Sequence, residues 1–230
     1  HYPTLHLLYE KGQWLIQGRL PVYIEDTEID NYLIDVVIPY DFPKSIPIFR
    51  EIGGRIPKEM DWHVKENGVC CPFVADEQWR YWSQGSGILE FLRGPVNDYF
   101  CSQTYRMAFG EYPFGERSHG SLGIWEYYTE ELGTDDLVVI TIFLAHLSQD
   151  AIRLDLPCYC GSRKALRRCH LDKVREFRKK INRQVARNSF VHMRDLQQLQ
   201  MRVVECCSAG RFSCTVGPSL LADQLVAPRS

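Results

Sequence analysis

Three cysteines and a histidine gathered within thirteen residues restrict how this chain can fold more than any other feature. The segment PCYCGSRKALRRCH places Cys158 and Cys160 one residue apart, and Cys169 and His170 follow after eight intervening residues. Gly161, directly after the first pair, permits a sharp reversal of the chain. Three thiolates and an imidazole are ligand types that hold a tetrahedral Zn²⁺. We therefore expect a small structural zinc module whose metal ligands are Cys158, Cys160, Cys169 and His170.

The other cysteines favour reduced thiols over a disulfide framework. The chain has nine cysteines, most of them in clumps such as Cys70-Cys71 and Cys206-Cys207. Adjacent cysteines rarely bond to each other, and an odd number of clumped thiols is typical of metal and catalytic usage. No apolar run approaches the ~20 residues of a membrane span, and no export segment is visible, so we expect a soluble, cytoplasmic protein without membrane partners. Because the chain opens at His1 without a Met, we expect the natural start to lie upstream.

The net charge of −2 conceals two electrically different parts. Residues 163–202 carry 13 Lys and Arg against 3 Asp and Glu, a net charge of +10, and the rest of the chain carries 14 against 26, or −12. A basic helix is expected at residues 171–188. The basic face of this helix can bind the phosphates of a nucleic acid. A run of charged residues is more often a solvated face, however, and this one can equally dock against the acidic part of the chain. Nucleic acid is therefore the less favoured partner. The basic residues of this helix are Lys173, Arg175, Arg178, Lys179, Lys180, Arg183 and Arg187.

Strands are expected in the first quarter of the chain. Residues 13–20 (QWLIQGRL) alternate apolar and polar side chains, and residues 32–39 (YLIDVVIP) are rich in β-branched side chains. An acidic connector separates the two. Prolines break the chain after the second strand, and residues 47–52 (PIFREI) offer a short third strand. This order predicts a three-stranded antiparallel meander.

Helices are expected in the rest of the chain. Apolar residues recur at helical spacing over residues 88–100, with a kink or junction at Gly94-Pro95. Beyond a turn-rich loop, further helices are expected at residues 124–132 and 135–149. We place the main boundary near residues 150–157. The expected parts are residues 1–150, a zinc module with its basic helix at 151–190, and a helical end with a flexible tail, unstructured from residue 208, at 191–230.

The order of these elements resembles the ubiquitin-conjugating enzyme fold. Residues 14–18 (WLIQG) look like that family's first core strand, and the run YLIDVVIPYDFPKSIPIF looks like its second strand, proline corner and third strand. The family's histidine, glycine, active-site cysteine, tryptophan and crossing helix are matched in order by His63, Gly68, Cys71, Trp79 and the helix from Ile88. The match covers residues 13–104. It implies an α+β fold, a meander with crossing helices, followed here by a helical extension and the zinc module.

The resemblance extends to the divergent bacterial conjugating-enzyme-like proteins of antiviral defence gene clusters. It implies that Cys71 accepts a ubiquitin-like protein as a thioester from an activating (adenylating) enzyme and passes it to an amine of a protein target. A deubiquitinase-like metallopeptidase is a further partner that the resemblance implies. The sequence leaves the particular ubiquitin-like protein and the target open.

The family's spacing selects between the two adjacent thiols. In the family the nucleophile stands three residues after the glycine and about eight before the tryptophan, and counting from Gly68 and from Trp79 both lead to Cys71. Cys70 then takes the place of the apolar residue before the nucleophile, since free Cys packs as a small hydrophobe. An exposed Cys, with a pKa near ~8.5, needs only modest help to react. The alternative is a pair of buried, inert thiols.

Two histidines are candidates to assist. His63-Val64-Lys65 replaces the family's His-Pro-Asn, so the asparagine credited with stabilising the oxyanion is absent. His63 can tune the thiolate or donate to the oxyanion, or it can pin the loop through a backbone hydrogen bond. His119, in a polar loop, can supply what the missing asparagine does not or bind the acceptor. The alternative for His119 is a capping loop in which Ser118 or Ser121 begins the next helix.

The zinc segment resembles the SEC-C motif, whose usual wording is Pro-Cys-x-Cys-Gly-Ser-Gly-Lys before Cys-Cys or Cys-His. Arg163 stands where glycine is common. The resemblance implies a role in protein binding rather than catalysis. Three functions therefore stay open: a conjugating enzyme, a non-catalytic variant of the same fold that only binds a ubiquitin-like protein, and a nucleic-acid-binding zinc adaptor.

Overall fold

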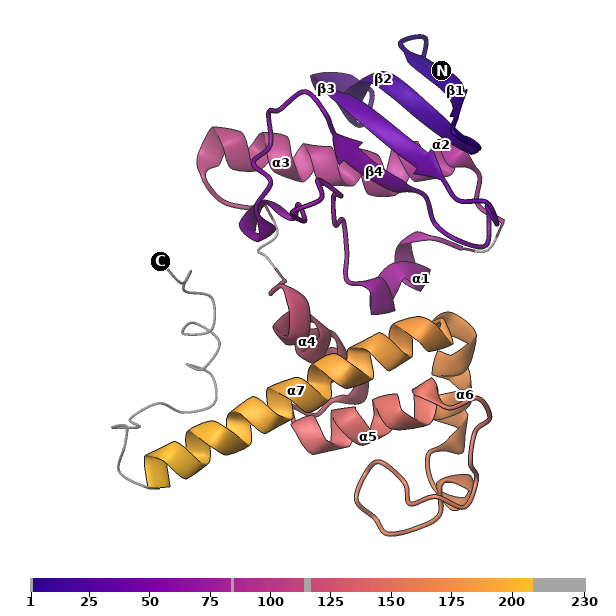
Figure 1. The fold of residues 1–230 in the computed structure, drawn as a ribbon, viewed down its shortest axis with the longest axis vertical. Helices are drawn as coiled ribbons and strands as arrows, with labels where there is room; N and C mark the ends of the chain where they lie inside the picture. Colours follow the sequence, from indigo (N-terminus) through magenta and orange to yellow (C-terminus); the bar gives the residue numbers. More distant parts are fainter. Residues whose placement is uncertain (1, 84, 114–116, 209–230) are drawn as a thin grey trace. The chain divides into compact units, whose positions relative to one another are not determined.

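A computed structural model of the chain describes residues 2–83, 85–113 and 117–208, which divide into two units (Figure 1). The first unit comprises residues 1–117 and the second residues 118–230. The boundary expected near residues 150–157 therefore falls inside the second unit. The tail expected at the end of the chain lies, beyond residue 208, outside the described residues.

The first unit contains a four-stranded antiparallel sheet in the order β1-β2-β3-β4, and the protein is α+β as expected. The strands are β1 (Leu5–Glu10), β2 (Gln13–Ile24), β3 (Thr27–Ile38) and β4 (Ile48–Glu51). The last three confirm the expected meander, whereas β1 is an additional edge strand, paired with β2 from Leu5↔Gly18 to Glu10↔Gln13. The expected acidic connector is wrong in part, because β2 and β3 continue through it to a tight turn at Glu25, which has a φ of 53°.

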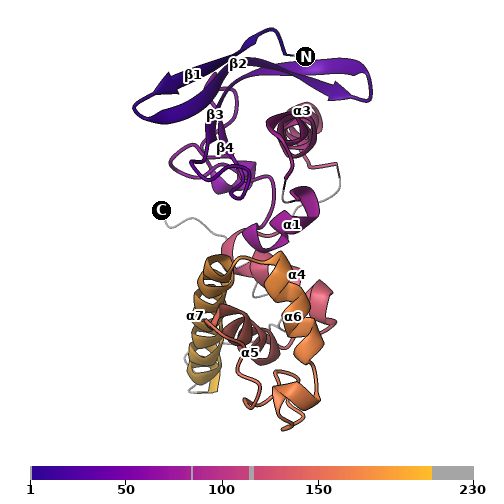
Figure 2. The same cartoon turned by 90° about the vertical axis from the view of Figure 1, so that its right-hand side faces the viewer.

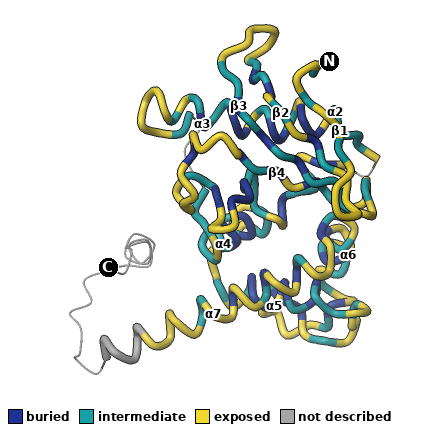
Figure 3. The backbone as a smooth tube through the Cα atoms, turned by 45° about the horizontal axis from the view of Figure 1, so that its top comes forward, coloured by how far each residue is buried: buried dark blue, intermediate teal, exposed yellow. Residues whose placement is uncertain are grey.

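One face of the sheet forms the core of this unit. Leu20, Tyr32 and Phe49 are buried there, and Tyr32 stacks on Phe100 with ring centroids 4.4 Å apart. The alternation of the strand sequences produces this face, because successive side chains of a strand point to opposite sides. Figures 1 and 2 show helix α3 lying across the face, and Figure 3 marks the interior between them as buried.

The helix that covers the sheet is irregular where Gly94-Pro95 predicts a kink. It runs as α2 (Ile88–Phe91), a π-helical turn η3 (Leu92–Val96) and α3 (Asn97–Phe109). Pro95 has no backbone N–H and cannot complete the regular ladder, so the wider turn accommodates it. Short turns η1 (Met60–Trp62) and η2 (Ala75–Glu77) and the one-turn helix α1 (Gln78–Tyr81) lie between β4 and α2.

Helices pack together in the second unit. They are α4 (Gly120–Leu132), α5 (Leu137–Ser148), α6 (Leu171–Lys180) and α7 (Arg183–Ser208), with the short turn η4 (Leu166–Arg168) in the cysteine segment. The helices expected at 124–132 and 135–149 are confirmed as α4 and α5. Their buried aromatic core includes Tyr127, Tyr128, Phe143 and Phe177.

The single basic helix expected at residues 171–188 is wrong, because the chain breaks between α6 and α7. Ile181 is buried in an extended conformation, with φ of −110° and ψ of 126°. The side chain of Asn182 then accepts a hydrogen bond from the backbone N–H of Gln184 at 2.7 Å, which caps the start of α7. A buried apolar residue followed by an N-cap residue thus ends one helix and begins the next.

Candidate active site and candidate metal centre

The segment with the adjacent cysteines extends the sheet beside β4. Antiparallel bridges pair Arg50 with Val69 and Val64 with Cys70. The backbone N–H of Cys70 donates to the carbonyl of Phe49 at 3.0 Å, and the N–H of Cys71 donates in the opposite direction, to the carbonyl of His63 at 2.8 Å. The cysteines therefore occupy a backbone that is fixed on both sides.

An Asn-Gly turn connects the two sides of this loop. Gly68 has a φ of 79°, in the left-handed region that favours glycine, and its N–H donates to the carbonyl of Lys65 at 2.7 Å. The side chain of Asn67 accepts from the N–H of Val69 at 3.2 Å. The turn sets the register that brings Cys71 opposite His63.

The two cysteines differ in their surroundings. Cys70 is 5% exposed within the core of the first unit, and burial raises the pKa of its thiol to about 11, against a smaller opposing effect of the neighbouring Tyr99 hydroxyl. Cys71 is half-buried, so it is the more exposed residue of the two. Burial also raises the pKa of Cys71, and the nearby ammonium of Lys65 opposes this shift. Of the two, Cys71 is the better placed to react.

His63 ends the turn η1 and begins the loop. Its backbone is left-handed, with a φ of 51°, and its N–H donates to the carbonyl of Met60 at 2.8 Å. The imidazole packs edge-on against Tyr112, with ring centroids 5.1 Å apart. The backbone of His63 thus holds Cys71 directly, while its ring belongs to an aromatic contact.

Residues of α3 fix the turn before His63, and the sequence reading missed them. The carbonyl of Trp62 accepts from the hydroxyl of Tyr99 at 3.2 Å and from the amide of Gln103 at 3.0 Å. The guanidinium of Arg106 lies 4.3 Å from the centre of the Trp62 ring and 4.7 Å from that of Tyr112. Their spacing of four and then three residues along one helix face is the signal that a sequence reading could have used.

His119 lies in the second unit, at the N-cap position of α4. Neither Ser118 nor Ser121 occupies that position. Instead, the side chain and N–H of Ser118 both donate to the carboxylate of Glu126, and the hydroxyl of Ser121 lies 3.2 Å from Nδ1 of His192. A role for His119 in catalysis stays a prediction.

The second candidate site brings together the four residues expected to bind metal. One ligand atom from each of Cys158, Cys160, Cys169 and His170 lies within 4.8 Å of all the others. Cys158 Sγ is 3.3 Å from His170 Nδ1, and Cys160 Sγ is 3.5 Å from Cys169 Sγ. A tetrahedral ion with metal–sulfur distances of about 2.3 Å and a metal–nitrogen distance of about 2.0 Å separates its ligands by roughly 3.5–3.8 Å. The cluster is close to that size and can hold a metal ion.

The loop around the cluster owes its shape to two left-handed residues. Gly161 has a φ of 73° and Arg163 a φ of 60°. Arg163 is therefore a non-glycine residue at a position whose conformation suits glycine. Between them, the hydroxyl of Ser162 lies 3.4 Å from Cys169 Sγ, and hydrogen bonds from Ser162 lower the pKa of Cys160 to about 6. Burial raises the pKa of Cys158 to about 11. Of these two thiols, Cys160 is therefore the one that ionises more readily.

Side chains of helix α5 contact the segment that carries the cluster. His146 is buried, and its Nε2 lies 3.0 Å from the carbonyl of Pro157, next to the first cysteine. Burial lowers the pKa of His146, which favours the neutral ring. Phe143 packs on Tyr159 with ring centroids 4.9 Å apart, and Tyr159 packs on His170. The sequence reading assigned His146 no role, since a histidine inside an apolar helix carries no motif.

Part of the expected basic face serves the fold of the second unit. The guanidinium of Arg178 donates to the carbonyls of Leu147, Gln149 and Asp150 at the end of α5. Ion pairs join Arg183 to Asp150 at 2.6 Å and Lys180 to Glu176 at 2.5 Å. These contacts reduce the number of cations that are available to a phosphate backbone.

Comparisons with protein-family models, curated proteins and solved structures gave no match to this chain. Within the described part of the chain, none of the helices has both the length and the apolar character needed to cross a membrane.

Proposed function

We propose that this chain is a conjugating enzyme for a ubiquitin-like protein, with Cys71 as the residue that carries the acyl group. The proposal rests on the resemblance of residues 13–104 to the conjugating enzymes together with one structural observation. Of two adjacent thiols, Cys70 is buried in the core, whereas Cys71 is the more accessible and is held by the carbonyl of His63. The partners in this proposal are the ubiquitin-like protein, its activating enzyme, a protein target and, in the same pathway, a deubiquitinase-like metallopeptidase.

The proposed reaction proceeds in two acyl transfers. The thiolate of Cys71 attacks the thioester carbonyl carbon of the charged activating enzyme, a new C–S bond forms, and the activating enzyme's thiolate leaves. An amine of the target then attacks the Cys71 thioester, a C–N bond forms, Cys71 leaves as a thiolate, and the amine proton passes to solvent. Thiol exchange needs no energy beyond that of the existing thioester. A reducing compartment such as the cytoplasm, which the clumped thiols favour, keeps Cys71 available.

The test is a charging reaction with the cognate activating enzyme and ubiquitin-like protein. We expect a product band that reducing agent removes. Cys71→Ser should abolish that band or replace it with a reduction-resistant oxyester, and the matched variant Cys70→Ser should retain it. Charging that depends on Cys70 and not on Cys71 would move the nucleophile by one residue, and the absence of charging in the unmodified chain would refute the proposal.

A binding-only variant of the same fold is the second candidate, and a specific observation favours it. Burial raises the pKa of Cys71, so only a small fraction of the thiol is ionised at neutral pH. A chain that only binds the ubiquitin-like protein would form the complex equally well with Cys71→Ala. Retained binding without any charging of the unmodified chain would select this candidate.

For the second unit we propose a structural zinc ion held by the Cys158 cluster, with a role in docking proteins. The three-thiol, one-imidazole donor set matches zinc's preferred ligands. When bound, the ion would fold and fix the loop between α5 and α6. A nucleic-acid adaptor is the rival here, and it predicts submicromolar binding at ~150 mM salt with a steep salt dependence. We expect little or no binding under those conditions, because Arg178, Lys180 and Arg183 are engaged within the unit.

A further inference from the structure

A cavity of about 1000 Å³ lies in the first unit between the tip of the β2–β3 hairpin and the helix that covers the sheet. Its helical wall comes from Arg93, Asn97, Cys101 and Tyr105, which recur every four residues and so share a face. Tyr99, which contacts Cys70, projects from another face of α3. The cavity is therefore separate from the cysteine loop, and what it binds does not depend on the proposed function.

Hydrogen bonds connect the two walls of this cavity, the β2–β3 hairpin and the helix. The side-chain amide of Asn97 donates to the carbonyl of Tyr23 and accepts from its N–H, both at 2.9 Å. The thiol of Cys101 donates to the same carbonyl at 3.3 Å. These bonds hold the hairpin at an irregularity in the pairing of β2 with β3, between Val22 and Tyr23. Fixing the hairpin to the helix in advance reduces the ordering cost of binding.

The lining is acidic in charge. Glu25 and Asp26 from the hairpin and Asp98 from α3 line the cavity together with one cation, Arg93, which gives a net lining charge of −2. Arg93 interacts with Tyr2. Asp98 is exposed to solvent, although partial desolvation by its neighbours raises the pKa of its carboxyl. Residues 1–117 carry 11 Lys and Arg against 17 Asp and Glu, or −6, so the field of the whole unit also attracts cations.

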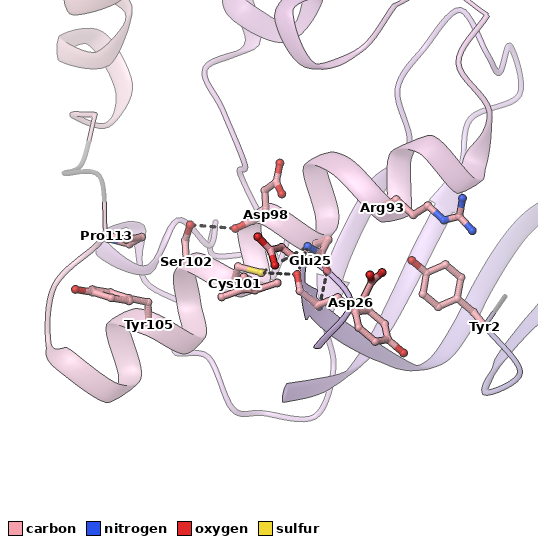
Figure 4. A pocket seen from close by; sticks show the side chains of 12 residues that line it. Tyr2, Glu25, Asp26, Arg93, Asp98, Cys101, Ser102, Tyr105 and Pro113 are labelled. Carbon is pink, nitrogen blue, oxygen red and sulfur yellow. Dashed lines mark hydrogen bonds between the residues drawn. The ribbon is translucent and has the colours of Figure 1, made fainter. Parts of the chain in front are cut away.

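Aromatic rings accompany these carboxylates. Tyr2, Tyr23 and Tyr105 line the cavity, and tyrosine faces attract organic cations. Figure 4 shows Tyr2 and Arg93 at one end and Tyr105 with Pro113 at the other, with the labelled acidic side chains between them. A volume of this size far exceeds that of a bare metal ion and lies at the upper end of small-molecule sites, roughly 300–1000 Å³.

From this combination we infer that the cavity binds an alkylammonium ligand, one with primary ammonium groups on a flexible carbon chain. The carboxylates pair with the ammonium groups, and the tyrosine rings and Ile24 cover the chain. Two sources share this chemistry: a free polyamine and the side chain of a protein lysine. The pairing of carboxylates at several points along the cavity suits a ligand with more than one ammonium group.

Isothermal titration calorimetry of the full chain tests this inference. Spermidine and Nα-acetyl-lysine amide serve as the probes, and an uncharged diol of similar length serves as the control. We expect saturable submillimolar binding of spermidine and none of the diol. Binding of acetyl-lysine amide in place of spermidine would also support the site and would identify protein lysine as its source. No binding of either amine, or equal displacement by Mg²⁺ at matched ionic strength, would overturn the inference.

Substitutions of the acidic residues that line the cavity test whether the amine binds there. Asp98→Asn and Glu25→Gln should each weaken spermidine by roughly tenfold, since each removes a charge-assisted contact. Glu25 and Asp98 are both exposed, so both variants should fold. The matched control Glu10→Gln removes an exposed carboxylate outside the cavity and should bind normally. Unchanged affinity in folded Asp98→Asn and Glu25→Gln would place the amine elsewhere and overturn the inference.

Discussion

The backbone N–H of Cys71 donates to the carbonyl of His63 at a distance of 2.8 Å, so the histidine holds the cysteine through its main chain. His63 is itself left-handed, with a φ of 51°. The direction of its carbonyl depends on that conformation. The structure therefore separates two possible roles of His63, one of the backbone and one of the ring.

Replacing His63 with glycine and with alanine distinguishes those roles. His63→Gly relieves the strain of about 1 kcal/mol that a left-handed backbone costs a residue with a Cβ, whereas His63→Ala loses the same ring and retains that strain. Since we assign His63 to the loop, we expect His63→Gly to charge on Cys71 and to transfer to an amine at near-normal rates, and His63→Ala to melt at a lower temperature than His63→Gly. Thermal melts and single-turnover gels measure both. Equal, large losses of amine transfer with intact charging in the two variants would assign the chemistry to the ring.

The reactivity of Cys71 should depend on pH in a defined direction. Burial raises its pKa above the ordinary value of about 8.5, so the thiolate fraction at pH 7 is small and should still be increasing at pH 9. We expect the rate of alkylation by iodoacetamide to increase about tenfold per pH unit from pH 7 to 9, with Cys70 reacting far more slowly because its pKa is about 11. Site-resolved mass spectrometry gives both rates.

Lys65 provides the companion test, since its charge lowers the pKa of Cys71. Lys65→Gln should shift the alkylation profile of Cys71 to higher pH and slow the reaction at pH 8. Lys44→Gln, an exposed lysine on another loop, is the control and should leave the profile unchanged. Identical profiles for Lys65→Gln and the unmodified chain would remove Lys65 from the environment of the thiol.

Metal content should be one equivalent of zinc per chain. Cys160→Ser should reduce it strongly, whereas Cys101→Ser, a cysteine outside the cluster, should not. Chelation should unfold the segment between α5 and α6, because in so small a module the binding free energy of the metal is most of the folding free energy. Metal analysis and circular dichroism measure the two effects. A purified, reduced chain with less than about half an equivalent would contradict the assignment.

Glycine at position 163 should stabilise the second unit. Arg163 is held at a φ of 60°, which costs a non-glycine residue about 1–2 kcal/mol, and the greater freedom of glycine in the unfolded chain offsets only part of this. We expect Arg163→Gly to raise the free energy of unfolding by about 0.5–1 kcal/mol in a chemical denaturation series. The neighbouring Lys164→Gly gains no such relief and should be neutral or destabilising. If Arg163→Gly is instead less stable, the guanidinium makes a contact whose stabilising free energy exceeds the cost of the left-handed backbone.

The local patterns of the sequence predicted the local structure well. Alternation located β2, β-branched composition located β3, and a short run after the prolines located β4. The metal cluster was predictable because a turn at Gly161 brings its ligands together. Strand β1 was missed because LHLLYE lacks a regular alternation, and the break at Ile181 was missed because the basic run contains no Gly or Pro. The support of Trp62 by Gln103 and the cavity at Asn97 each join segments more than 40 residues apart, which only the fold brings together.

The extended backbone at Cys70 and Cys71 has a consequence for how this loop can change. Successive residues of an extended segment point to opposite sides, so one thiol is directed inward and its neighbour outward. The position of the Gly68 turn determines which of the two cysteines points inward. A deletion of one residue between that turn and the cysteines would shift each following residue by one place, so that Cys71 enters the interior position of Cys70 and Pro72 takes the outward position of Cys71. The loop therefore tolerates substitution of its side chains far better than any change in its length.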